Sequence, residues 1–292
     1  MNTGILAAIG AYASWGLLPV YWKLLAHVPT LQLLGHRIVW SFVVLALFLA
    51  VKKRLRALRH SLSPAVWRIY IAASLLIGVN WCVYVWSVNA GYIVETSLGY
   101  FINPLLSVLL GMVFLRERLR RLQWIPLMLA ASGVLYLTWS HGKPPWIALC
   151  LAVTFSLYGL VKKKAPLGAF EGLTLETGLL LPPALTWLGL CAARGTGSFT
   201  QAGLESDLLL VGAGLITTGP LVLFASAAQR IPLNMIGILQ YIAPSIQFLI
   251  GVLVYGEAFT HTQMIGFGAV WTAIVLFLLE RWWAGRNSRL VV

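Results

Sequence analysis

Two stretches of this chain, 140 residues apart, carry the same pattern of prolines, glycines and glutamates. Residues 98–104 read LGYFINP, and residues 238–244 read ILQYIAP. The same offset pairs Pro104 with Pro244, Gly111 with Gly251, Glu117 with Glu257 and Gln123 with Gln263. Since 140 residues is nearly half of the 292-residue chain, the repeat predicts a fold built from two related halves.

The composition indicates that the lipid bilayer surrounds most of this chain. Hydrophobic residues make up 60% of the sequence and charged residues only 10%, whereas a soluble domain has about 45–50% and about 25%. The net charge of +13 does not point to nucleic acid, because the basic residues lie in short clusters between apolar runs. We therefore expect the bilayer, and no nucleic acid, as a partner.

Apolar segments of the length that spans a membrane occur ten times, which predicts an all-α integral membrane protein. They cover residues 3–22, 31–51, 67–89, 97–115, 122–140, 145–161, 172–192, 207–228, 234–255 and 262–283. The runs are too long, and alternate too little, for the strands of a membrane β-barrel.

The distribution of Lys and Arg predicts the orientation of the chain. With the N-terminus in the cytoplasm, seventeen of the 21 basic residues fall on the cytoplasmic side and Lys23, Lys143 and Arg194 fall outside. Arg37 lies within a predicted span. This bias predicts that both termini are cytoplasmic, and the compact loops are typical of a bacterial inner-membrane protein.

An odd number of spans in each half predicts that the second half is inserted upside down. The first repeat would be 1–141, with helices 1 to 5, and the second 142–292, with helices 6 to 10. Inverted repeats supply two gates around one site near the bilayer midplane. The sequence therefore predicts a secondary transporter that works by alternating access, with a small organic solute as its substrate.

Several local motifs carry a resemblance to a known family. They are Ala13–Gly16, His36–Ser41, Asn80–Trp81, Trp86–Asn89, Glu95–Pro104, Tyr158–Gly159, Glu176 and the stretch from Gln240 to Glu257. In these the chain resembles the EamA family of the drug/metabolite transporter superfamily, and more narrowly its RarD-like branch. The resemblance implies export of amino acids, other metabolites or drugs, and it does not choose among them.

Arg37 is the first candidate for binding substrate, since an ionisable residue inside a span costs roughly 2.5–3.5 kcal/mol to insert. Its planar guanidinium would hold an anionic group such as a carboxylate. A structural ion pair, or an extended side chain that reaches the outer headgroups, is the alternative. His36 is a second candidate, but it points about 100° away around the helix.

Aromatic and amide side chains in the spans are further candidates for lining a substrate cavity. They are Trp15, Asn80, Trp81, Tyr84, Tyr100, Asn103, Tyr158, Gln240 and Tyr241. Apolar walls with a few polar groups are typical of sites for organic ligands. Tryptophans and tyrosines can instead anchor span ends at the membrane interface, and amides can join neighbouring helices.

Three titratable residues are candidates for coupling transport to protons: Glu176, His36 and Glu95. His36 and Glu176 are also 140 residues apart, as symmetry mates would be. Glu176 could bind a proton or a substrate amine, or it could form an ion pair with Arg37. His36 could instead be hydrogen-bonded between helices.

Pro104, Pro244, Glu117 and Glu257 are candidates for gating. Each proline removes a backbone hydrogen bond and can bend its helix, which would make either a hinge or a static kink. The two glutamates close equivalent helices, and an ion pair is expected for Glu117 because four arginines surround it.

Sequence signatures of enzymes are missing from the chain. It has no phosphate-binding GxxxxGK[ST] motif and no HExxH or GxSxG motif. We therefore expect no catalytic activity, no cofactor and no metal site. A non-transporting membrane sensor or assembly subunit remains the alternative function, and the oligomeric state stays open.

Overall fold

The computed structural model describes residues 3–90, 92–140, 145–256 and 260–287, and this part of the chain contains helices but no strands. The helices are α1 (Thr3–Leu24), α2 (Thr30–Val51), α3 (Leu55–His60), α4 (Pro64–Asn89), α5 (Ile93–Leu115), α6 (Trp124–Ser140), α7 (Trp146–Lys164), α8 (Ala169–Ala193), α9 (Leu204–Arg230), α10 (Leu233–Gln240), α11 (Ile242–Leu253) and α12 (His261–Asn287). A short 3₁₀ helix, Arg121–Gln123, precedes α6.

The expected membrane spans are confirmed. In the described residues, nine helical stretches are long and apolar enough to cross a membrane, with α10 and α11 counted together as Leu233–Leu253. The shorter apolar stretch Met264–Glu280 in α12 accounts for the tenth. Large apolar side chains such as Trp139, which is 89% exposed, lie on the outer surface. Such a surface is suited to lipid, and helices satisfy their own backbone hydrogen bonds there.

The helices pack in pairs as two related halves would. α1 packs on α9 as α7 packs on α4, α5 packs on α7 as α11 packs on α1, and α2 packs on α9 as α8 packs on α4. The remaining large contacts join α2 to α8, α5 to α10 and α6 to α12. The predicted boundary between repeats 1–141 and 142–292 falls outside the described residues, so these boundaries stay a prediction.

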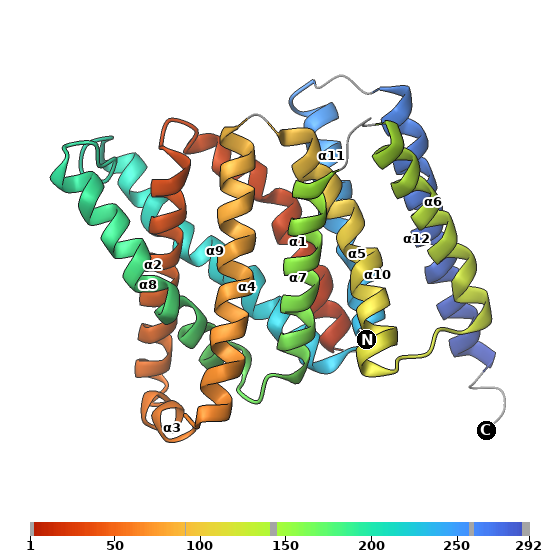
Figure 1. Ribbon diagram of the computed structural model, residues 1–292, viewed down its shortest axis with the longest axis horizontal. Coiled ribbons are helices and arrows are strands. Elements are labelled where there is room, and N and C mark those ends of the chain that lie inside the picture. Colours follow the sequence, from red (N-terminus) through yellow and green to blue (C-terminus); the bar gives the residue numbers. More distant parts are fainter. Residues whose placement is uncertain (1–2, 91, 141–144, 257–259, 288–292) are drawn as a thin grey trace.

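The long axis of the bundle runs roughly perpendicular to most of its helices (Figure 1). α2 and α8 lie at one end of its long axis, and α6 and α12 lie at the other. α1 begins and α12 ends on the face where α3 lies. The basic loops that follow α2, α5 and α7 also lie at this face, which we call the α3 face.

The ninth expected span, 234–255, is not one continuous helix. α10 ends at Gln240, Tyr241 separates the two helices, and α11 begins at Ile242. Pro244 lies in the first turn of α11, where its missing N–H leaves the carbonyl of Gln240 without its usual helical donor. The equivalent helix, α5, runs through Pro104 without a break.

Two glycines allow the central helices to approach closely. A Cβ atom at Gly237 of α10 would lie 2.6 Å from the carbonyl oxygen of Pro104 in α5. A Cβ atom at Gly214 of α9 would lie 2.4 Å from the carbonyl carbon of Trp40 in α2. Ser41 reinforces the second crossing, since its hydroxyl donates to the carbonyl of Gly214 at 3.1 Å. Small residues at such crossings are typical of membrane helix packing.

Candidate functional site

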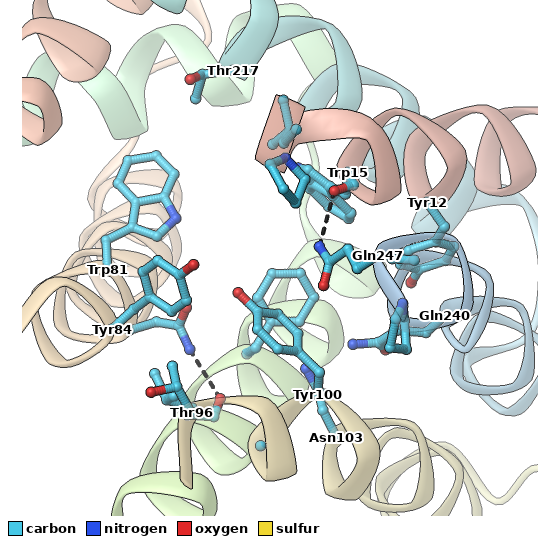
Figure 2. A pocket seen from close by; sticks show the side chains of 18 of the residues that line it. Tyr12, Trp15, Trp81, Tyr84, Thr96, Tyr100, Asn103, Thr217, Gln240 and Gln247 are labelled. Carbon is cyan, nitrogen blue, oxygen red and sulfur yellow. Dashed lines mark hydrogen bonds between the residues drawn. The ribbon is translucent and has the colours of Figure 1, made fainter. Parts of the chain in front are cut away.

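A cavity of about 130 Å³ lies between α1, α2, α4, α5, α7, α9, α10 and α11. Its lining is Tyr12, Trp15, Leu18, Pro19, Trp22, Arg37, Asn80, Trp81, Tyr84, Thr96, Gly99, Tyr100, Asn103, Leu151, Phe155, Thr217, Leu221, Gln240, Ala243, Pro244 and Gln247. Several of these residues lie in the halves of their helices that are farther from the α3 face. Figure 2 shows aromatic rings and amides around the cavity.

Many of the residues singled out in the sequence meet at this cavity. Eight of the candidates for substrate binding line it: Trp15, Arg37, Asn80, Trp81, Tyr84, Tyr100, Asn103 and Gln240. Pro244, a candidate hinge, lines it as well. The break between α10 and α11 therefore opens onto the cavity, as discontinuous helices do at transporter sites.

Arg37 is held in the cavity by aromatic rings and one hydroxyl. Its Nε donates to Oγ1 of Thr217 at 3.0 Å, and its guanidinium carbon lies 4.7 Å from the ring of Trp22 and 5.3 Å from that of Trp81. No carboxylate of the described residues forms an ion pair with it. The guanidinium is therefore fixed by cation–π contacts, and with respect to the described residues its two terminal NH₂ groups remain as donors for a ligand.

The two asparagines of the cavity each use one end of the amide to join helices. Nδ2 of Asn80 in α4 donates to the carbonyl of Leu151 and to Oγ1 of Thr154, both at 2.9 Å and both in α7. Oδ1 of Asn103 in α5 accepts a hydrogen bond from Ser156, also in α7, at 2.6 Å. Oδ1 of Asn80 and Nδ2 of Asn103 are the amide atoms that the described part of the chain leaves for a ligand.

The amide of Gln247 joins α11 to α1. Its Nε2 donates to the carbonyl of Trp15 at 3.0 Å, as Figure 2 shows. Across the cavity, the rings of Tyr84 and Tyr100 meet edge to face with their centroids 6.1 Å apart. The wall therefore combines aromatic surface with a few fixed polar atoms, which suits a small organic ligand.

An aromatic cluster closes the end of the cavity that faces the α3 face. Trp15 contacts Phe155 and Phe224 with centroid distances of 5.8 Å and 5.7 Å. Tyr158 stacks on Phe224 at 5.9 Å. Because Tyr158 and Phe224 are 0% and 1% exposed, this cluster leaves no open path for a solute through its centre.

A buried ion pair lies beyond the aromatic cluster. Nζ of Lys162 in α7 is 2.7 Å from Oε1 of Glu176 in α8, and the two residues are 0% and 1% exposed. The hydroxyl of Tyr158 donates to Oε2 of Glu176 at 2.8 Å. The suggested pairing of Glu176 with Arg37 is therefore wrong, because the carboxylate pairs with Lys162 of α7, the preceding helix in the chain.

Three other candidates for substrate binding do not line the cavity. His36 is buried with its ring 5.2 Å from that of Phe199, on the side of α2 away from Arg37. Tyr158 lies in the aromatic cluster, and the hydroxyl of Tyr241 donates to the carbonyl of Phe101 at 3.3 Å. The 100° step between consecutive helical residues explains why Arg37 and His36 point apart.

Glu117 caps a helix instead of pairing with the arginines around it. Its Oε1 accepts from the N–H of Leu233 at 2.7 Å, and its Oε2 accepts from the N–H of Asn234 at 2.9 Å. A carboxylate is favourable at the start of α10, where the backbone N–H groups have no helical partners. The expected ion pair is wrong for the described residues, and the contact ties the end of α5 to α10.

Two further candidates cannot be placed. Glu257 and the side chain of Glu95 lie outside the described residues. The described residues hold no group of three or more His, Cys, Asp or Glu side chains placed to bind a metal ion.

Sequence reasoning missed several residues of the cavity, chiefly Tyr12, Trp22 and Thr217. Tyr12 lies one turn of α1 before Trp15, so helical spacing from a known candidate could have found it. Trp22 resembled an interfacial tryptophan, because it stands near the end of its span. Thr217 belongs to α9 and meets Arg37 only through the packing of α9 on α2, which no local pattern indicates.

The fold and the cavity define a class: a multi-pass membrane protein whose helices enclose a space suited to a small solute. Residues 2–139 match the EamA-like transporter family. An uncharacterized transporter of Vibrio cholerae is 45% identical, over 98% of this chain and 95% of that protein. The chain is therefore a membrane transporter.

Two proteins named RarD are similarly close. Protein RarD of Streptomyces exfoliatus is 44% identical, over 99% of this chain and 92% of that protein. Protein RarD of Escherichia coli is 40% identical, over 98% of this chain and 97% of that protein. The chain belongs to the EamA-like transporter family, in its RarD-like branch. Since its relatives are bacterial and its helices apolar, it is a multi-pass protein of the inner membrane.

A solved crystal structure shares the fold. It superposes with a TM-score of 0.72 at 20% sequence identity and covers 96% of this chain and 98% of the other. The likeness extends the fold well beyond the close relatives.

Proposed function

We propose that this protein is a secondary transporter that exports a small organic anion by alternating access through the cavity. Arg37 would pair with the anionic group, and the aromatic walls would contact the rest of the solute. The observation that carries the proposal is the position of Arg37. Of the described residues that line the cavity, it is the one with a full charge, and it has no carboxylate partner among them.

The contacts of Arg37 support a binding role over a structural one. A structural arginine in a membrane protein pairs with an acidic residue or reaches the headgroups. Arg37 instead lies against Trp22 and Trp81, and its hydrogen bond within the described structure is the one from Nε to Thr217. A carboxylate would bind the free fork of NH₂ groups with charge-assisted hydrogen bonds.

The closed side of the cavity supports alternating access. The aromatic cluster, the Lys162–Glu176 pair and the cap that Glu117 places on α10 all lie between the cavity and the α3 face. The positive-inside rule makes the α3 face cytoplasmic, because it carries the basic loops. In this interpretation the inner gate is shut, and transport requires a second conformation in which these contacts open.

The test compares the medium of cells that overproduce the wild type, Arg37→Ala or the control Arg194→Ala, using untargeted metabolite profiling. Arg194 is exposed and lies just after α8, away from the cavity. We expect an organic acid to accumulate outside with the wild type and the control. Arg37→Ala should lower its export by about 10- to 100-fold, since a hydrogen bond to a charged group contributes roughly 1.5–3 kcal/mol.

Two results would contradict parts of the proposal. Equal export by Arg37→Ala, at equal protein levels, would remove the role of Arg37 in binding the anion. No enriched solute with the wild type, together with no flux in liposomes under any gradient, would favour the non-transporting sensor or assembly subunit.

A further inference from the structure

Two buried polar atoms at the cavity have no hydrogen-bond partner in the described part of the chain. They are the hydroxyl oxygen of Tyr12 and Oε1 of Gln240. Both residues line the cavity, and they are only 1% and 5% exposed. Because an unpaired polar atom in an apolar interior is costly, nearly all such atoms in folded proteins are satisfied. Two of them beside one cavity indicate where a polar group of a bound ligand would be satisfied once the side chains around the cavity move to admit it.

This polar pair lies deeper than Arg37. With a rise of 1.5 Å per residue, Tyr12 is about 18 Å from the outer end of α1, and Arg37 is about 10 Å from the outer end of α2. Figure 2 shows Tyr12 and Gln240 on the side of the cavity away from Trp81 and Tyr84. Since Arg37 contacts Trp81, the cavity has a cationic end and an uncharged polar end.

The atoms at the polar end select the chemistry of the ligand. Oε1 of Gln240 accepts hydrogen bonds only, whereas a phenol such as Tyr12 both donates and accepts. A ligand hydroxyl has the chemistry that both atoms need, because it can donate to an amide oxygen and accept from a phenol. An ammonium group would add a second cation to a cavity whose described lining already carries the charge of Arg37 and offers no carboxylate, and burying an unpaired charge is unfavourable.

We propose that Tyr12 and Gln240 form a subsite for an uncharged hydroxyl group of the transported solute. The solute is then a hydroxylated organic monoanion and not a zwitterion. This inference rests on the proposed function, in which Arg37 binds the carboxylate. Gln240 is the last residue of α10, so the hydroxyl would bind at the break between α10 and α11.

The experiment measures binding of radiolabelled probes to the purified full-length protein in detergent. The probes are para-hydroxyphenylacetate, phenylacetate and tyrosine, because the rigid ring separates the carboxylate from the hydroxyl by a span comparable to the depth difference. The variants are Tyr12→Phe, which removes one oxygen atom, Gln240→Met, and Arg37→Ala, which shows whether binding of either acid needs the guanidinium. The control is Tyr136→Phe, since Tyr136 is 41% exposed on α6.

We expect the wild type and Tyr136→Phe to bind para-hydroxyphenylacetate about 10-fold more tightly than phenylacetate, as one satisfied hydrogen bond predicts. Tyrosine should bind more weakly than para-hydroxyphenylacetate. Tyr12→Phe and Gln240→Met should bring the two acids to nearly equal affinity, with phenylacetate binding unchanged. If either variant is unstable in thermal unfolding, the other one alone carries the comparison.

The outcomes separate the two proposals. If both acids bind the wild type equally well and need Arg37, the hydroxyl subsite is wrong and the proposed function stands. Tighter binding of tyrosine would likewise overturn the preference for a monoanion. If neither acid binds the wild type, both the subsite and the role of Arg37 in anion binding fail.

Discussion

Two cations inside the bundle, Lys162 and Arg37, show how the surroundings of a residue decide its role. Lys162 is fully buried and lies against Glu176 at 2.7 Å, so its charge is neutralised within the protein. Arg37 contacts tryptophan rings and a threonine. No described carboxylate neutralises its charge, so a ligand can do so. The sequence places both in or beside a span, and it does not distinguish them.

Removing one partner of the buried pair should destabilise the protein. Glu176→Gln leaves Lys162 without a counter-charge, and breaking a buried pair in this way costs roughly 3–5 kcal/mol. The double variant Lys162→Met, Glu176→Gln should recover most of the loss, because neither charge remains. Thermal unfolding of the purified proteins in one detergent measures both effects.

The same variants test whether Glu176 couples transport to protons. If the pair is structural, the double variant transports with the pH dependence of the wild type. A double variant that folds normally but has lost that dependence would assign the proton to Glu176. Equal unfolding temperatures for wild type and Glu176→Gln would contradict the structural role.

At the level of residues, the sequence predicted which side chains line the cavity better than it predicted the residues that they contact. Insertion cost singled out Arg37, and helical spacing separated it from His36, which indeed points elsewhere. The partners Thr217 and Lys162 come from packing between helices far apart in the chain. Local patterns carry no information on such contacts. This is why the ion pair of Glu176 with Arg37, one of the predicted alternatives, is wrong.

At the level of elements, the close crossing of α2 and α9 depends on one glycine. Gly214 leaves room for the backbone of Trp40, and a methyl group there would overlap it at 2.4 Å. Gly219, in the same helix, has nothing within 4 Å of its would-be Cβ atom. The two positions form a matched pair for substitution.

Gly214→Ala should lower the unfolding temperature, because forcing two packed helices apart costs roughly 1–3 kcal/mol. Gly219→Ala should leave it unchanged or slightly raised, since alanine favours helix over glycine by about 1 kcal/mol. Differential scanning fluorimetry in one detergent makes the comparison. Similar melting temperatures for the two variants would show that the crossing has room to adapt.

The apolar runs predicted where the helices lie but not how they are interrupted. Residues 234–255 form one predominantly apolar stretch of span length, yet the helix is interrupted at Tyr241. Pro104 occupies the equivalent place in α5, which stays continuous. The outcome at each proline therefore depends on the packing around it and not on the proline alone. α3 was also not expected, because its short sequence is basic and has no apolar run.

At the level of the whole molecule, the ends of the helices predict a testable topology. α3 and both described ends of the chain lie at the α3 face, and the loop that follows α8 lies at the opposite face of the bundle. All three native cysteines, Cys82, Cys150 and Cys191, lack a disulfide bond. Replacing them with alanine gives a background for single cysteine probes.

In that background, a membrane-impermeant maleimide should label Arg194→Cys in intact cells. Arg59→Cys, exposed on α3, should react only after the inner membrane is permeabilised, because basic loops stay in the cytoplasm. Gel shift of the labelled protein records both results. Labelling of Arg59→Cys in intact cells would reverse the predicted orientation while leaving the fold unaffected.

The charge of Arg37 in the described lining of the cavity has a consequence for energetics. In a carrier that works as proposed, Arg37 and a bound anion form a neutral complex, so the membrane voltage does little work on the loaded protein. The empty carrier moves a positive charge, and about 2.3 kcal/mol acts on each elementary charge per 100 mV across the full membrane. An inside-negative voltage then favours the conformation in which the empty site faces the cytoplasm, where it can bind the next anion. The membrane potential would thus drive export by returning the empty carrier to its inward-facing conformation.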